Sequence, residues 1–120
     1  MSWTYDQPSG AMWHDGAIVA YGYSGKGDGK DNPAMESVHN VGPIPRGAYI
    51  ICAPHDTASH GPYVLALDPD PENDMHGRSG FLIHGDSKSD PGNASEGCII
   101  LGRAFREQIW NSGDRELIVT

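Results

Sequence analysis

Two short stretches of the chain carry our expectation for its fold and its chemistry: Phe81-Leu-Ile-His84-Gly85-Asp86 and Ser95-Glu-Gly-Cys98-Ile-Ile-Leu101. In each stretch, apolar residues typical of a buried strand meet a polar loop. His84 ends the first strand and Cys98 begins the second. If the two strands are neighbours in a sheet, the imidazole and the thiol can face one cleft.

Outward from these stretches, the sequence favours short strands and turns, with 16 Gly and 9 Pro residues. Leu101, Phe105 and Ile109 are spaced by four residues, which predicts a helix over about 103–111 that Gly113 would end. We therefore expect one mainly β domain with about five to seven short strands and one late helix. Strands are expected at 12–23 (with a turn at 14–16), 48–53, 63–67, 81–84, 98–101 and 116–119, and polar loops at 24–40, 55–61, 68–74 and 85–97.

Composition narrows the classes of function. The net charge is −8 with only eight Lys and Arg, so we expect no nucleic-acid partner. No run approaches the ~20 apolar residues of a membrane span, and the first seven residues show no signal peptide, so we expect no membrane insertion and synthesis in the cytoplasm. Two cysteines do not make a disulfide framework, and Cys52, in an apolar run, is expected to be a small buried residue.

A histidine that takes the proton of a nearby cysteine turns a weakly ionised thiol into a competent nucleophile. Gly97 would leave room for a substrate carbonyl, and the N–H groups of Gly97 and Cys98 could bind the oxyanion. Spacing alone also fits a buried cysteine and a strand-end histidine with a local hydrogen bond.

The surrounding sequence favours the catalytic interpretation over a merely structural cysteine and histidine. His84-Gly85 followed by Ser95-x-Gly97-Cys98-Ile99 resembles the signature of the L,D-transpeptidases. Together with further stretches, it resembles the L,D-transpeptidase-like effectors of type VI secretion over roughly residues 16–101. Those stretches are Tyr23-Ser-Gly-Lys-Gly27, Asn32-Pro33, Gly42-Pro-Ile-Pro-Arg-Gly-Ala-Tyr49 and Gly77-Arg-Ser-Gly-Phe-Leu-Ile-His-Gly-Asp86.

The resemblance implies that residues 1–120 form a single catalytic domain built on a curved sheet or sandwich. Cys98 would attack the amide between meso-diaminopimelate and D-Ala in the peptidoglycan stem tetrapeptide. His84, oriented by a backbone carbonyl, would act as base and then as acid. Water would complete an L,D-carboxypeptidase reaction and a D-amino acid would complete an exchange; the sequence leaves both open. No cofactor or metal is implied.

Two positions depart from the broad family. Glu96 stands at the position where the broad family has a histidine before Gly-Cys. Ile100 stands at the position where that family has an arginine, two residues after the cysteine. These departures favour hydrolysis or exchange over cross-linking. Arg78, Lys88 or Arg103 could supply the missing positive charge for the carboxylate of the stem.

The remaining site candidates have structural alternatives. Gly85, Ser95 and Gly97 are expected to shape the site or the oxyanion hole, although Ser95 also suits a bond within its loop. Asp86 could contact substrate or orient His84, or form a turn. The substrate-binding candidates are Asp86, Arg78 and Tyr63, of which Tyr63 equally suits core packing.

Rival functions remain open. His76, His84, Asp86 and Cys98 could bind zinc, but they lack paired ligand spacing. The fold could serve as a cell-wall binding module without activity, or as a phage or domestic wall enzyme. The resemblance instead implies an antibacterial toxin that a type VI system delivers to the periplasm of a target cell, with a cognate immunity protein in the producer.

Overall fold

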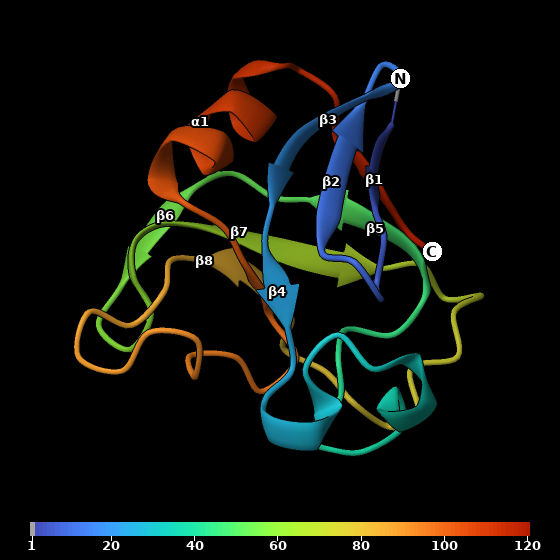
Figure 1. The fold of residues 1–120 in the computed structure, drawn as a ribbon. Helices are drawn as coiled ribbons and strands as arrows, with labels where there is room; N and C mark the ends of the chain where they lie inside the picture. The colour runs from blue at the N-terminus through green and yellow to red at the C-terminus, as the bar shows by residue number, and fades with distance from the viewer. Residues whose placement is uncertain (1) are drawn as a thin grey trace.

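The computed structural model describes residues 2–120 and shows a mixed β-sheet with one α-helix against it (Figure 1). The strands follow the order β3-β2-β1-β10-β5-β7-β8-β9-β4, and β6 pairs with β7. The pairings β1–β10 and β8–β9 are parallel, and the others are antiparallel. The elements are β1 (Trp3–Tyr5), β2 (Ala11–His14), β3 (Ala17–Tyr21), β4 (Tyr23–Ser24), η1 (Gly27–Gly29), η2 (Pro33–Met35), β5 (Gly47–Ile51), β6 (His55–Thr57), β7 (Gly61–Pro69), β8 (Leu82–His84), β9 (Ile99–Ile100), α1 (Arg103–Asn111) and β10 (Glu116–Val119).

The sheet curls so that its two ends come together. Only Gly22 separates β3 from β4, yet these strands stand at opposite ends of the strand order. A Cβ atom on Gly22 would lie 2.1 Å from the carbonyl oxygen of Ile100, and one on Gly10 would lie 2.0 Å from the carbonyl oxygen of Gly22. Glycine is therefore required at both positions, because only a hydrogen atom fits the close approach of these backbones.

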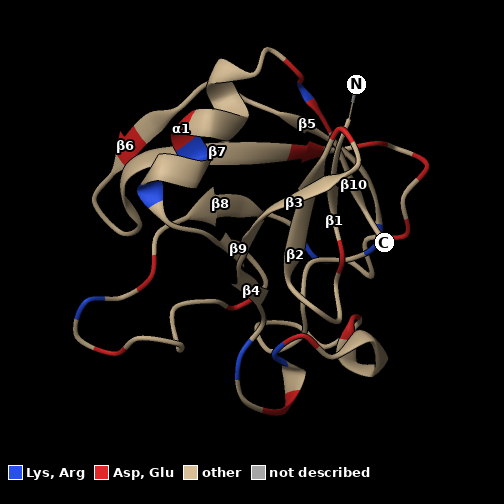
Figure 2. Ribbon diagram, turned by 45° about the horizontal axis from the view of Figure 1, so that its top comes forward, with Lys and Arg blue, Asp and Glu red and all other residues tan. Residues whose placement is uncertain are grey.

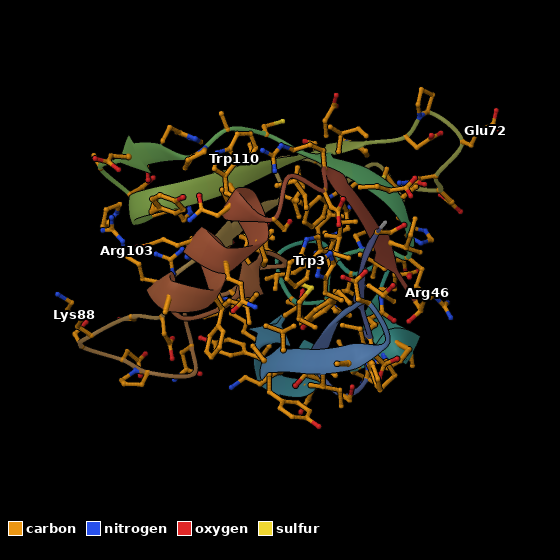
Figure 3. All side chains as sticks on the ribbon, turned by 90° about the horizontal axis from the view of Figure 1, so that it is seen from above. Trp3, Arg46, Glu72, Lys88, Arg103 and Trp110 are labelled. Atoms are coloured by element: carbon orange, nitrogen blue, oxygen red, sulfur yellow. The ribbon has the colours of Figure 1, made fainter. Side chains whose placement is uncertain are left out.

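The core lies inside this curled sheet and under α1. Trp3, Tyr5, Ile83 and Leu117 are fully buried there, and Figure 3 shows Trp3 in the interior of the molecule. At about 25 cal/mol per Å² of apolar surface, burying residues of this size supplies most of the drive for the curled arrangement. The core thus holds β8 and its neighbours in place, and with them the ends of the strands that carry His84 and Cys98.

The fold class predicted from the sequence is confirmed, since the chain forms one mainly β domain with one short C-terminal helix. The helix runs over Arg103–Asn111, as its spacing predicts, and Gly113 follows it with a φ of 80°. Its predicted apolar face is partly wrong. Phe105 is 38% exposed, whereas Arg106 is buried because its guanidinium donates to the carbonyls of Pro62, Tyr63 and Leu101.

Several expected loops contain structure. The stretch 55–61 includes β6, β7 continues to Pro69 within the expected loop 68–74, and the stretch 24–40 holds two 3-10 turns. Pro69 is tolerated because it is the last residue of its strand, where a missing N–H costs little. The strand β1 was not predicted, and Cys52 is half-buried rather than buried.

The surface is acidic without a single acidic segment. Figure 2 shows Asp and Glu residues spread over several loops and strand ends, interrupted by Lys and Arg. Across residues 2–120, none of the helical segments combines the length and apolar character that crossing a membrane would require.

Candidate active site

His84 and Cys98 come from adjacent parallel strands. Ile83 pairs with Ile99 and His84 pairs with Ile100, so the end of β8 lies beside the start of β9. The two strands are thus neighbours in the sheet, which is the condition under which both side chains can face one cleft. The Leu101 N–H donates to the His84 carbonyl at 3.0 Å and continues the ladder beyond both strands. The ladder therefore holds the backbone that presents both side chains.

Both side chains line one cavity of about 390 Å³. Its walls come from the loop after η2, the turn between β6 and β7, the segment that leads into β8 and β8 itself, and the turn before β9. Its remaining lining residues are His39, Asn40, His60, Gly77, Arg78, Ser79, Gly80, Phe81, Ala94 and Glu96. A thiol and an imidazole thus share a hollow that opens to solvent, as thiol chemistry on a peptide requires.

The ring of His84 is held in one tautomer. Its Nδ1 lies 2.8 Å from the Gly85 carbonyl oxygen, and because a carbonyl can only accept, Nδ1 carries the proton. The other nitrogen, Nε2, then bears the free lone pair. Burial lowers the pKa of His84, and His60 and Arg106 lower it further, against a raising effect of the Gly85 hydrogen bond. At neutral pH the ring is therefore uncharged and ready to accept a proton.

The thiol of Cys98 is equally a neutral group. Burial raises its pKa, while a backbone hydrogen bond from Leu82 and the charge of Arg78 act in the opposite direction. Burial is the stronger effect, so at neutral pH the sulfur keeps its proton. At rest the cavity holds a neutral thiol, whose Sγ lies 3.9 Å from the Gly80 carbonyl oxygen, and a neutral imidazole rather than a preformed ion pair. The proton must therefore move when the sulfur attacks.

Two buried serines hold the turn that presents Cys98. Ser95 Oγ accepts from the N–H groups of Gly25 at 2.8 Å and Gly97 at 3.1 Å, and it donates to the Cys98 carbonyl. Ser24 Oγ donates to the Gly97 carbonyl at 2.7 Å. Ser95 therefore has the loop role that its sequence allowed. No role was predicted for Ser24, because nothing local to residue 24 signals a partner 73 residues away.

Gly97 is required by conformation. Its φ is +136°, and a Cβ atom there would lie 2.5 Å from Arg78 Nη2 and 2.8 Å from Phe81 Cε1. An L side chain would be strained in this backbone region and would also clash. Because the Gly97 N–H already donates to Ser95 Oγ, its predicted part in an oxyanion hole stays a prediction.

Arg78 is buried, lines the cavity of about 390 Å³ and links separate segments of the chain through hydrogen bonds. Its Nη1 donates to the carbonyls of Glu36 at 2.6 Å and Pro43 at 2.7 Å. Its Nη2 donates to the carbonyls of Gly42 at 2.9 Å and Glu96 at 3.2 Å. One guanidinium thus joins the loop after η2, the approach to β5 and the turn before Cys98. Its predicted binding of a substrate carboxylate stays a prediction.

Asp86 organises the loop that follows His84. It accepts from Tyr23 Oη at 2.6 Å and from the N–H groups of Ser87 and Gly92, and Tyr23 Oη in turn accepts from the Ala94 N–H at 3.0 Å. Burial is the largest single influence on the pKa of Asp86 and would raise it. The hydrogen bonds together outweigh burial, so the pKa of Asp86 is lowered. The predicted turn role of Asp86 is thus present in the structure.

A second cavity, of about 880 Å³, lies on the other side of His84. Gly85, Asp86, Lys88, Arg103 and Arg106 line it, and the residues it shares with the first cavity are His60, His84 and Ala94. Figure 3 shows Lys88 at the tip of an extended loop and Arg103 on the outer side of α1.

Tyr63, predicted to bind substrate or to pack in the core, lines neither cavity. Its ring packs against the core beneath the guanidinium of Arg103, 5.2 Å from the ring centroid.

One neighbour of His84 was not predicted. The ring centroid of His60 lies 4.6 Å from that of His84, with the planes tilted by 53°. His60 sits in a polar turn 24 residues before His84, and its local sequence carries no ligand or catalytic spacing.

The residues considered for a zinc site do not converge. His76 Nε2 lies 2.9 Å from Glu36 Oε2, and Asp86 is engaged by Tyr23. Within the described part of the chain, no group of three or more His, Cys, Asp or Glu side chains is arranged to hold a metal ion.

Comparison with known families assigns the chain. Comparison with curated proteins gives no match. The Tlde1 domain family matches residues 19–116, which include β4, both strands of the site and the whole of α1. That stretch holds His84, Cys98 and the serines of the turn that presents Cys98. By this match over most of its length, the chain belongs to the Tlde1 domain family of type VI secretion effectors, a family consistent with an antibacterial role at the cell wall.

Proposed function

We propose that this chain is a cysteine-dependent peptidoglycan L,D-carboxypeptidase and D-amino-acid exchange enzyme. The observation that carries the proposal is the shared cavity of Cys98 and His84, in which the His84 tautomer leaves Nε2 free to accept a proton. Its substrate is the stem tetrapeptide, cut at the bond between diaminopimelate and D-Ala. Residues 1–120 form the catalytic domain.

In the first half of the reaction, Cys98 Sγ attacks the carbonyl carbon of the diaminopimelate–D-Ala amide while His84 Nε2 takes the thiol proton. The oxyanion forms near the Cys98 N–H, a better donor than the Gly97 N–H, which Ser95 already engages. When the C–N bond breaks, His84 returns the proton to the leaving amine of D-Ala. The product is a thioester between the stem and Cys98.

In the second half, water or the amine of a free D-amino acid attacks the thioester. His84 takes a proton from the attacking group, the C–S bond breaks, and the proton returns to the sulfur. Water gives a shortened tripeptide stem and a D-amino acid gives a swapped terminal residue. Arg103 and Lys88, which line the second cavity beside His84, are the cations proposed to bind a terminal carboxylate.

The family supports a proposal for delivery. We propose that a type VI system carries the protein from the cytoplasm of the producer into the periplasm of a target cell, where the wall substrate lies. A cognate immunity protein that blocks the cavity would protect the producer, because the same wall chemistry is present in both cells.

The direct test incubates the protein with disaccharide tetrapeptide, with and without an added D-amino acid, and measures the products by mass spectrometry. Loss of D-Ala is expected without the additive, and replacement of D-Ala is expected with it. An unchanged muropeptide under both conditions refutes the proposal.

Variants identify the groups responsible. Cys98→Ala and His84→Gln are expected to abolish turnover while retaining the far-UV circular dichroism of the parent. The matched control is Cys52→Ala, which removes the second, half-buried thiol outside the cavity and is expected to retain full turnover. Toxicity that persists in both site variants would instead indicate a binding module without catalysis.

A further inference from the structure

The turn that carries His60 is firmly held. It joins β6 to β7 with Thr57 paired to Gly61, and the His60 N–H donates to Thr57 Oγ1 at 2.8 Å. Arg106, from α1, donates to the carbonyls of Pro62 and Tyr63 and so ties the start of β7 to the helix. The position of His60 is therefore set by sheet pairing and by a buried guanidinium.

His60 covers His84. The His60 residue is exposed, whereas His84 is only 3% exposed, and their ring centroids are 4.6 Å apart. The two rings line both cavities, so they stand between the space beside Cys98 and the space beside Arg103. His60 thus lies against the ring of His84 where the two cavities adjoin.

We propose that His60 is a positioning residue, which packs against the ring of His84, keeps it in the orientation set by Gly85, and shields it from water. This inference rests on the proposed function for its effect on turnover, but not for its effect on the ring of His84 itself. It requires no contact between His60 and the reacting atoms.

The shielding has an electrostatic consequence. The charged and titratable groups that act on His84 are His60 from the β6–β7 turn, Arg106 from α1 and Asp86 from the loop after β8. The other such residues that line its two cavities are His39, Arg78, Lys88, Asp90, Glu96, Cys98 and Arg103. Burial is the largest influence that lowers the pKa of His84, and His60 adds to it. Removing the cover hydrates the imidazolium and so lets that pKa rise toward its ordinary value.

The test compares His60→Ala with His60→Phe, which keeps an aromatic ring over His84 but has no titratable nitrogen. His55→Ala is the matched control, because His55 is an exposed histidine on the same hairpin that lines neither cavity. Two readouts are taken in the full chain: the pKa of His84 by NMR titration of its ring, and the pH profile of kcat/KM on disaccharide tetrapeptide.

In His60→Ala the pKa of His84 is expected to rise by roughly half a unit to one unit, with the acid limb of kcat/KM shifting equally. Its kcat/KM at neutral pH is expected to fall about tenfold, because a loosened base meets the thiol less often in the productive geometry. His60→Phe is expected to keep at least about a third of parental kcat/KM, since the packing remains. His55→Ala is expected to match the parent in both readouts.

Two results would overturn the proposal. An unchanged His84 titration in His60→Ala would show that the ring needs no cover. A loss of kcat/KM in His60→Phe as large as in His60→Ala would show that the His60 nitrogens themselves meet the substrate. If the parent does not turn over muropeptide, the proposed function fails, and the NMR titration still decides the positioning role.

Discussion

Replacing Arg78 with methionine tests how the cavity is held together. The substitution keeps most of the side-chain volume but removes the guanidinium that donates to the carbonyls of Glu36, Pro43, Gly42 and Glu96. Because these bonds join segments far apart in the chain, their loss should weaken the whole domain and not one loop.

The magnitude follows from the contacts. A hydrogen bond from a charged donor contributes about 1.5–3 kcal/mol, so four independent bonds would give about 6–12 kcal/mol. The net value is smaller, because burial of the guanidinium carries a desolvation cost, seen in a pKa of Arg78 that burial lowers. We expect a loss of about 3–5 kcal/mol in the free energy of unfolding. For a domain of this size that corresponds to a fall in Tm of about 12–20 °C.

The assay is urea unfolding followed by tryptophan fluorescence, with thermal unfolding by circular dichroism alongside. Arg78→Lys, which keeps the charge but not the planar fork, is expected to lose about half as much. Arg103→Met is the control. Its side chain is 55% exposed, and its one ion pair among residues 2–120 is the exposed pair with Glu107, so the substitution should cost less than about 1 kcal/mol. If Arg78→Met lowers the free energy of unfolding by less than about 1 kcal/mol, as the control does, then Arg78 does not link these segments in a way that stabilises the domain.

Three further outcomes are expected. Gly97→Ala should lower stability by about 2–4 kcal/mol and abolish turnover, because its Cβ meets Arg78 in a backbone region of positive φ; urea unfolding and muropeptide assays check both. As pH is lowered, the kcat/KM of the parent should fall only below the ordinary histidine pKa, since burial lowers the pKa of His84. In His84→Gln, the rate at which iodoacetamide alkylates Cys98 should rise with pH, with a midpoint above the ordinary thiol pKa because burial raises the pKa of Cys98. An alkylation midpoint below neutrality would contradict a neutral thiol. Glu36→Gln should cost about 1–3 kcal/mol at pH 7. Burial alone would raise the pKa of Glu36, but hydrogen bonds from Arg46, His76 and Gln7 lower it to about 2, so its stabilisation is full above the ordinary carboxyl pKa and is lost as pH falls toward 2; urea titrations of parent and variant should converge there.

The sequence by itself determined the local elements that have a strong period or a clear end. The spacing of Leu101 and Ile109 with the following Gly113 predicts the helix, and runs of β-branched residues predict the strands that carry most of the core. The apolar runs next to His84 and Cys98 also place both residues at strand ends. Such signals are readable because each arises from neighbours along the chain.

Elements without a local signal were missed. The three residues of β1 are too few to show a period, and they form a strand because β2 and β10 offer backbone partners on both sides. Likewise β6 lies in a polar stretch and forms only against β7. In both cases tertiary hydrogen bonding overrides a weak local preference.

The arrangement of the site was decided by the tertiary structure alone. The sheet curls until β3 and β4, neighbours in the chain, stand at its two ends, and this closure brings Ser24 to the turn before Cys98. The same folding sets Arg78 among four distant carbonyls and lays His60 against His84. Such contacts leave no signal in the sequence around a residue. Which polar groups meet is decided by burial and by backbone pairing between segments far apart in the chain, and not by local spacing.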